Sequence, residues 1–400
     1  MKYFIIILSA FYLILCNKAQ AQLYFLGDKK AMQENKGIAK TRSQSPELTT
    51  IIKNAEIVLN KREVSVAEKK LLPASKNRND YYSLATYWWP DVNKGKDAPY
   101  IRKDGQANPS RLEISDFTYL KRICEDIRTL GYAYYFTSDK KYAEKAEKLL
   151  YTWFVNPTTK MNPNLEFSQV ILGKNNNKGR AEGLIDTKNF VYMLEGVELM
   201  STDGGLSNGT IADLKKWFSE YLNWLVNSPI GQKGGALKNN LATTYYLQVL
   251  AYSKFIDIDK NRTLAQSIIN KGVKNLLTAQ FDNYGRQPLE LTRTNSWSYS
   301  VSNLTYWFNI ANLAEDFGID LWNFTPKNKK ILASGLTYLN ENAFKNWKHQ
   351  QDSPTSLKSS VLALNTIAIR KINGFKGISI DGSTLKGIDA MSLNLLLLDN

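Results

Sequence analysis

The chain has 400 residues, of which 43% are hydrophobic, enough for one large domain or two medium-sized domains with real cores. Its formal net charge of +15 favours a polyanionic partner, although no nucleic-acid-binding motif accompanies the charge. The only histidine is His349, which argues against a histidine-based metal site, and we expect neither metal nor cofactor.

The N-terminus has the pattern of a secretory signal peptide. Lys2 precedes an apolar run over residues 4–16 that only Ser9 interrupts, and residues 19–21 form an Ala-Gln-Ala cleavage site. We therefore predict a signal peptide over residues 1–21, with cleavage after Ala21 and a secreted or periplasmic mature protein. A lipoprotein is the weaker alternative, because a bulky leucine rather than a small residue precedes Cys16.

Removal of this segment changes both the charge and the cysteine count. Loss of Lys2 and Lys18 would lower the formal net charge from +15 to +13, and Cys124 would remain without a disulfide partner in the chain. A basic exported chain with 12% aromatic residues favours an acidic polysaccharide, since aromatic rings stack on sugars. No later apolar run is long enough to span a bilayer.

After a polar, flexible lead-in over residues 22–47, helical periodicity of apolar residues dominates the chain. The predicted helices cover residues 46–72, 114–136, 140–155, 187–200, 211–227, 242–255, 264–281, 301–317, 328–344 and 356–369. Long polar loops cover residues 73–110, 156–186, 228–240 and 282–299. This spacing predicts an all-α fold over residues 48–400: a single α/α toroid, an incomplete barrel of stacked helical hairpins with its long loops at one end. The alternative is an α-solenoid or a bundle without a cleft.

The loop at 282–299 ends on two residues that could carry chemistry. Tyr299 should lie at the positive end of the helix that follows, and Arg293 could reach the same pocket. An arginine beside a phenol lowers the pKa of the phenol, and such a tyrosine can take a proton from carbon and return it to a leaving oxygen. The alternative is that Tyr299 is a wall residue and Arg293 a surface charge.

Several motifs resemble, in the same order, the alginate lyase domain of bacterial secreted proteins. They lie at residues 80–91, 99–109, 153–154, 161–166, 179–187, 239–240 and 287–300, and the resemblance runs from about residue 50 to residue 370. It implies an α/α toroid that cleaves a uronate polymer by β-elimination, with alginate (as polymannuronate) or glucuronan as the substrate. It also implies a catalytic set of Tyr299, Arg293 and Asn240.

The expected substrate-binding residues lie in or near these motifs and are Tyr87, Trp88, Arg102, Gln169, Arg180, Glu182, Asn239, Tyr245 and Glu290. Structural roles stay open for some of them. Trp88 could be a core residue, Glu182 could simply pair with Arg180, and Asn239 and Asn240 could cap the next helix.

One position departs from the family pattern. The family usually has Asn-Asn-His here, but this chain has Leu241 after Asn239 and Asn240. In mannuronate and glucuronate H5 and O4 lie on the same side, so Tyr299 alone can serve as base and then acid. Guluronate needs a second group on the opposite face, normally the histidine. Leu241 therefore favours same-side substrates and slow turnover.

Three other functions remain open from the sequence. The chain could be a weakened or inactive relative that only binds acidic polysaccharide. The hypothesis of a helical repeat that binds nucleic acid is supported by the net charge alone, and we expect no nucleic-acid partner. A hydrolase would need a paired acid and base, and nothing marks any two of Glu166, Glu182, Asp186 and Glu290 as such a pair. We expect a monomer.

Overall fold

The computed structural model describes residues 32–33, 36–37 and 46–378, except residues 92, 96, 97, 99, 203, 344, 346, 354 and 356. The predicted signal peptide, most of the lead-in and residues 379–400 lie outside the described residues. The extent of the domain over 48–400 therefore stays a prediction.

Helices make up most of the described chain. The main ones are α3 (Pro46–Leu59), α4 (Asp116–Thr137), α5 (Lys140–Leu150), α6 (Asn189–Thr202), α7 (Asn208–Asn227), α8 (Pro229–Gly235), α9 (Asn240–Ile268), α10 (Lys274–Gln280), α11 (Pro288–Leu291), α12 (Ser296–Asp316), α13 (Ile331–Ala343) and α14 (Leu357–Lys371). Short helical turns are η2 (Val66–Glu68), η3 (Pro109–Glu113), η4 (Tyr151–Val155), η5 (Asn175–Asn177), η6 (Ala181–Lys188), η7 (Ile269–Val273) and η8 (Pro326–Asn328).

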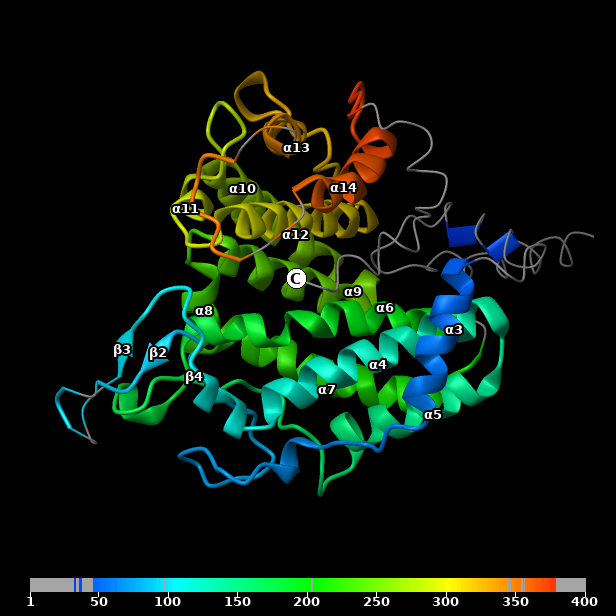
Figure 1. Ribbon diagram of the computed structural model, residues 1–400. Coiled ribbons are helices and arrows are strands. Elements are labelled where there is room, and N and C mark those ends of the chain that lie inside the picture. Colours follow the sequence, from blue (N-terminus) through cyan, green and yellow to red (C-terminus); the bar gives the residue numbers. More distant parts are fainter. Residues whose placement is uncertain are drawn as a thin grey trace, which may run out of the picture.

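The helices alternate between an inner and an outer layer. The inner helices contact one another in the order α4, α6, α9, α12 and α14, while α5 packs on α4, α7 on α9 and α13 on α14. Figure 1 shows these helices stacked side by side, with the strands, α8 and α11 at one end of the stack. This is the incomplete α/α toroid that the helix spacing predicts.

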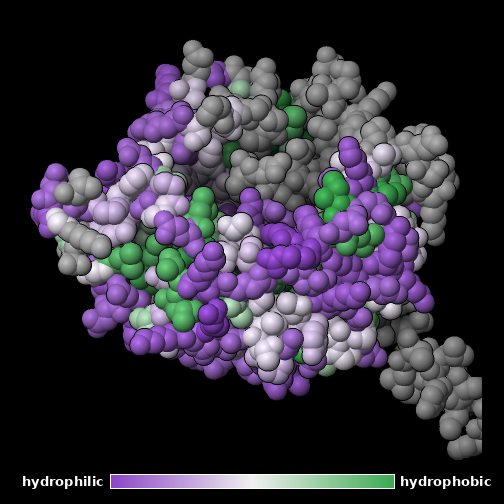
Figure 2. All heavy atoms as spheres, turned by 60° about the horizontal axis from the view of Figure 1, so that its bottom comes forward, coloured by the Kyte–Doolittle hydropathy of each residue, from purple (hydrophilic) through white to green (hydrophobic). Residues whose placement is uncertain are grey.

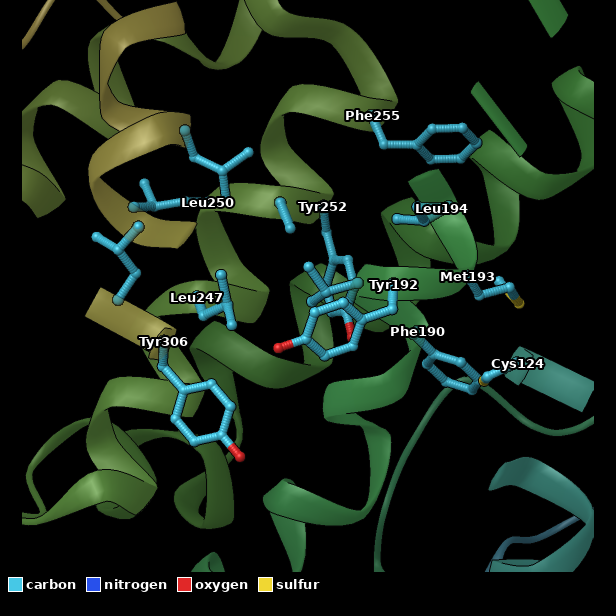
Figure 3. Close-up of a cluster of buried hydrophobic side chains, with 14 of the residues drawn as sticks. Cys124, Phe190, Tyr192, Met193, Leu194, Leu247, Leu250, Tyr252, Phe255 and Tyr306 are labelled. Carbon is cyan, nitrogen blue, oxygen red and sulfur yellow. The ribbon is translucent and has the colours of Figure 1, made fainter. Parts of the chain in front are cut away.

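The inner helices have apolar residues on every side because other helices surround them. In α6 the run Phe190 to Leu194 is buried throughout, as is Leu304 to Ala311 in α12. Figure 3 shows part of this core, where Phe190, Tyr192 and Leu194 meet side chains of other inner helices. Cys124, the cysteine expected to remain unpaired, is a free buried thiol in this core.

A pair of glycines lets α4 and α6 approach closely. A Cβ added at Gly131 would lie 2.5 Å from the Cα of Gly196, so any larger residue would force the helices apart. Beside this contact Arg128 of α4 donates to the Glu195 carboxylate of α6 at 2.9 Å, with both side chains buried. Breaking such a buried pair leaves an uncompensated charge, so it ties the two helices together.

Three predicted helices differ from the observed ones, and the helix predicted over 264–281 is divided among the end of α9, the turn η7 and α10. The helix predicted over 46–72 ends at Leu59, and the separate turn η2 begins after Ser65, whose side chain accepts from the Ala67 amide. The helix predicted over 242–255 begins at Asn240 and runs to Ile268 through a kink at Asp257. The apolar pattern weakens after residue 255, and the kink there re-aims the helix.

Four short strands lie in the long loops, where the sequence showed little strand pattern. β1 (Tyr82–Leu84) pairs in parallel with β4 (Phe167–Val170), and β2 (Trp88–Trp89) pairs antiparallel with β3 (Ile101–Arg102). They fix loops 73–110 and 156–186 against each other at one end of the toroid (Figure 1).

The described surface is largely polar. In the face shown in Figure 2, hydrophilic residues predominate and hydrophobic ones form separate small patches. Within the described ranges, no helix combines the length and the hydropathy needed to cross a membrane.

Candidate active site

A cavity of about 450 Å³ opens where the long loops meet the inner helices. Its lining comes from distant parts of the chain and consists of Ala85, Thr86, Tyr87, Trp88, Arg102, Phe117, Gln169, Arg180, Glu182, Ile185, Asp186, Lys188, Leu237, Asn239, Asn240, Leu241, Arg293 and Tyr299. All three predicted catalytic residues line it, as do seven of the predicted substrate-binding residues (Tyr87, Trp88, Arg102, Gln169, Arg180, Glu182 and Asn239). Tyr245 and Glu290 do not.

The hairpin of β2 and β3 carries one wall of the cavity. Trp88 pairs with Arg102 across the hairpin, and the Lys103 amide donates to the Tyr87 carbonyl at 2.8 Å. Asn108 closes the base of the loop, since its side chain donates to the Trp88 carbonyl at 2.9 Å. The hairpin thereby holds Tyr87, Trp88 and Arg102 over the same space.

Tyr299 lies in the first turn of α12, where the sequence places the start of a helix. Its hydroxyl is 2.9 Å from the hydroxyl of Tyr87, and either oxygen can be the donor. The Arg293 guanidinium carbon lies 4.1 Å from the centroid of the Tyr299 ring. The three residues therefore form one contact group, although loops 73–110 and 282–299 supply them separately.

The predicted lowering of the Tyr299 pKa is wrong. Burial raises the pKa of Tyr299 well above its usual value, and the hydrogen bond and proximity to Tyr87 raise it further. Arg293 lowers this pKa, but by less than burial raises it. The reason is geometric: Arg293 lies over the ring face rather than against the phenolic oxygen, and it also faces Asp104.

Asp104 was not singled out from the sequence, but it joins both arginines of the cavity mouth. Its carboxylate lies 2.6 Å from Arg102 and 3.6 Å from Nε of Arg293. The following Gly105 has φ of +73°, and a Cβ there would lie 2.6 Å from Oγ1 of Thr294. The loop can press against residues 293–294 only because position 105 is glycine. The sequence signal was Asp-Gly inside the motif at 99–109.

Asn239 and Asn240 begin α9 in different roles. The Asn239 side chain caps the helix by accepting from the Leu241 amide at 3.3 Å. Asn240 is buried, and its side-chain oxygen has no hydrogen-bond partner among the described residues. An unsatisfied buried amide at the wall of a cavity is costly unless a ligand completes its hydrogen bonds.

Glu290 lies behind this wall rather than in it. Its Oε1 accepts from the Asn240 amide at 2.8 Å, and burial raises the pKa of Glu290 to about 7 despite that bond and the nearby Arg293. Tyr245 is also placed in the core, because its ring packs on Gly234 and Gly235. Both residues support the start of α9 from outside the cavity.

Trp88, Arg180 and Glu182 form a second cavity wall. Arg180 donates to Glu182 at 2.9 Å, and its guanidinium carbon lies 5.9 Å from the Trp88 ring centroid. The Lys174 amine lies 4.5 Å from the same ring. Trp88 is half-buried, so it is a wall residue of the cavity rather than a core residue.

Gln169 and Asp186 lie at the base of this wall. The Gln169 side chain donates to Oδ1 of Asp186 at 2.8 Å, while Oδ2 accepts from Ser83 at 2.6 Å and from Tyr81 at 3.0 Å. The Asp186 carboxylate is therefore fully used in holding β1 and β4 to η6. Of the other carboxylates considered for a hydrolase, Glu166 accepts from Trp224, Glu182 pairs with Arg180 and Glu290 is behind the wall. The described residues that line the cavity therefore include no free pair of carboxylates.

Leu241 lies in the cavity wall at the position where the resemblance led us to expect histidine. His349 does not replace it, since its ring contacts Trp347 and its Nε2 lies 3.3 Å from the Tyr338 hydroxyl. Lys188 is a cavity residue that the sequence analysis missed. The feature of the sequence that could have identified Lys188 is its position directly after the motif at 179–187. Among the described residues, no group of His, Cys, Asp and Glu could hold a metal ion.

Comparison with known proteins agrees with this architecture. The structure is similar to an alginate lyase from Bacteroides ovatus, with a TM-score of 0.81 and 29% sequence identity over 94% of this chain and 96% of that one. A histidine-to-alanine variant of alginate lyase A1-III has a TM-score of 0.50 and 14% identity over 86% and 93% of the two chains, a likeness that extends to the fold alone. No curated relative matches the chain. The alginate lyase family model matches residues 65–346, so the chain belongs to the alginate lyase family and is a polysaccharide lyase.

Proposed function

We propose that this lyase cleaves polymannuronate or glucuronan by β-elimination, with Tyr299 as the base and then the acid. The observation that carries the proposal is the shared cavity of Tyr299, Arg293 and Asn240, with the Tyr299 hydroxyl bonded to that of Tyr87. The B. ovatus relative, an alginate lyase, supports an alginate-type substrate. A secreted or periplasmic monomer fits this activity.

Arg293 and Asn240 would neutralise the substrate carboxylate. The Asn240 side-chain oxygen and the Arg293 Nε have no hydrogen-bond partner among the described residues. Hydrogen bonds donated by the Asn240 side-chain Nδ2 and by the Arg293 guanidinium to the C6 carboxylate would make H5 acidic. The Tyr299 phenolate then takes H5, the electron pair forms the C4–C5 double bond, and the C4–O4 bond breaks. Tyr299 returns the proton to O4.

Because the pKa of Tyr299 is raised, its phenolate forms only if neighbouring groups stabilise it. A hydrogen bond favours whichever protonation state it satisfies, so Tyr87 stabilises the phenolate only as the donor. We infer that Tyr87 donates in the reacting complex and that Arg293 supplies the positive field. With leucine at 241, Tyr87 and Arg293 are groups that contact Tyr299 directly.

The second candidate is a weakened or inactive relative that binds acidic polysaccharide. Two observations favour it: Leu241 lies in the cavity wall and the Tyr299 pKa is raised. Binding would use the same walls, so affinity alone does not separate the two candidates. The formation of a product does.

The test is the ultraviolet absorbance of the unsaturated uronate on polymannuronate, polyguluronate and glucuronan. The protein should form product on polymannuronate or glucuronan, and Tyr299→Phe should lose it, because each proton transfer is worth roughly 10²–10⁴-fold. Tyr284→Phe is a matched control, since Tyr284 is 72% exposed and lies outside the cavity. Binding without product on all three polymers would support the second candidate. Activity retained by Tyr299→Phe would remove Tyr299 from the mechanism.

A further inference from the structure

The cations of the cavity differ in how they are compensated. Arg102 and Arg293 face Asp104, and Arg180 pairs with Glu182. Lys188 lines the same cavity, yet no carboxylate of the described residues forms an ion pair with it. Its amine instead donates to the Tyr306 hydroxyl at 2.8 Å and lies 5.3 Å from the centroid of the Tyr306 ring. Among the cavity cations, Lys188 is thus the one left to meet a negative charge of the ligand.

The position of Lys188 follows from its partner. Tyr306 is on α12, seven positions after Tyr299, which places it on the same helix face about two turns away, roughly 10.5 Å along the axis. Both side chains lean toward the start of α12, so the offset between them is kept. Lys188 therefore reaches a part of the cavity about two turns deeper than the reacting tyrosine, more than the span of one pyranose ring.

Beyond Lys188 and Tyr306, buried side chains fill the interior of the toroid. Tyr192 of α6 accepts from the Asn309 side chain of α12 at 3.2 Å, and Tyr192 and Tyr306 are both buried. Figure 3 shows Tyr192 and Tyr306 on different helices within the cluster of buried side chains. A saccharide chain that enters from the hairpin side would therefore have its innermost unit near Lys188.

We propose that Lys188 binds the carboxylate of a uronate unit at the inner end of the cavity, one or more units away from the unit that reacts at Tyr299. This inference rests on the proposed function and names a specificity-determining residue of the same site. The chemistry is that of a half-buried amine with one neutral partner, which gains a charge-assisted bond when a carboxylate arrives. The Tyr306 hydroxyl, as acceptor, keeps the amine aimed at the cavity.

The experiment separates binding from turnover. In a Tyr299→Phe background, calorimetry measures the binding of an oligomannuronate and an oligoglucuronate, each compared with its carboxyl-reduced form. Lys188→Met should weaken binding of the uronate oligomer by about 10- to 100-fold and leave the carboxyl-reduced form unchanged. Lys188→Arg should restore most of the affinity. Lys140→Met, which removes an equal charge from the exposed start of α5, is the matched control.

A second readout uses Tyr299 intact. Lys188→Met should raise KM on the polymer with little change in kcat, because the contact is made equally before and during the reaction. Equal affinity of Lys188→Met and its parent for the uronate oligomers would overturn the role of Lys188 while leaving the proposed function in place. If neither uronate oligomer binds the Tyr299→Phe protein, the proposed function fails and the inference fails with it.

Discussion

The hydroxyl of Tyr87 is the most informative single atom to remove. It lies 2.9 Å from the Tyr299 hydroxyl, and Tyr87→Phe deletes it while keeping the ring in the cavity wall. If Tyr87 donates to the phenolate in the reacting complex, the change raises the Tyr299 pKa and slows proton abstraction. If Tyr87 only accepts, the change removes a bond that favours the neutral phenol, and the rate does not fall.

The structure sets the size of the effect. A hydrogen bond to a charged group is worth about 1.5–3 kcal/mol, so loss of a bond to the phenolate should lower kcat about 10- to 150-fold. The same energy corresponds to a rise of about one to two units in the pKa that governs the alkaline rise in rate. KM should change little, because the Tyr87 ring remains in place.

The assay is the pH dependence of kcat, followed by ultraviolet absorbance of the unsaturated product. Tyr81→Phe is an unsuitable control, since that hydroxyl holds Asp186, so Tyr284→Phe at the exposed surface serves instead. An unchanged kcat and an unchanged pH profile in Tyr87→Phe would refute the view that Tyr87 stabilises the phenolate.

Three further predictions follow from individual contacts. Leu241→His should speed cleavage of polymannuronate or glucuronan and could add cleavage of polyguluronate, since position 241 is in the cavity wall. A folded variant that is no faster than the parent on any polymer would show that position 241 is not a vacated catalytic position. Glu290→Gln should flatten the pH dependence of stability. The pKa of Glu290 is 4.5 in the unfolded chain and about 7 in the folded protein, so the free energy of unfolding of the parent falls by up to about 3 kcal/mol as the pH rises through that range. Identical melting-temperature profiles of variant and parent from pH 4 to 8 would contradict this. Gly105→Ala should lower the free energy of unfolding by about 1 kcal/mol or more and raise KM, because the added Cβ meets Thr294. Gly95→Ala is the control and should leave KM unchanged: Gly95 also has a positive φ (+91°), but a Cβ there meets no atom within 4 Å.

Local patterns in the sequence predicted the helical elements, and the resemblance to the alginate lyase domain supplied ten of the eighteen residues that line the cavity. The apolar spacing from Val301 onward predicted α12 and placed Tyr299 at its start. The leucine at 241, where the resemblance led us to expect histidine, was also visible without coordinates. Asp104 and Lys188 were missed because each gains its meaning from a partner far along the chain, Arg293 and Tyr306 respectively.

The sequence by itself determined the helix periodicity, the alternation of short joints and long loops, and the residue types of the site, because these depend on neighbours a few positions apart. Only the tertiary structure decided which charges are compensated and what the surroundings do to each acid. Arg293 alone suggested a tyrosine with a low pKa, yet burial in the cavity raises the pKa of Tyr299 instead. Glu290 likewise became a support for Asn240 rather than a cavity residue. Desolvation depends on every atom that packs around a group, and the packing brings together segments that no local pattern connects.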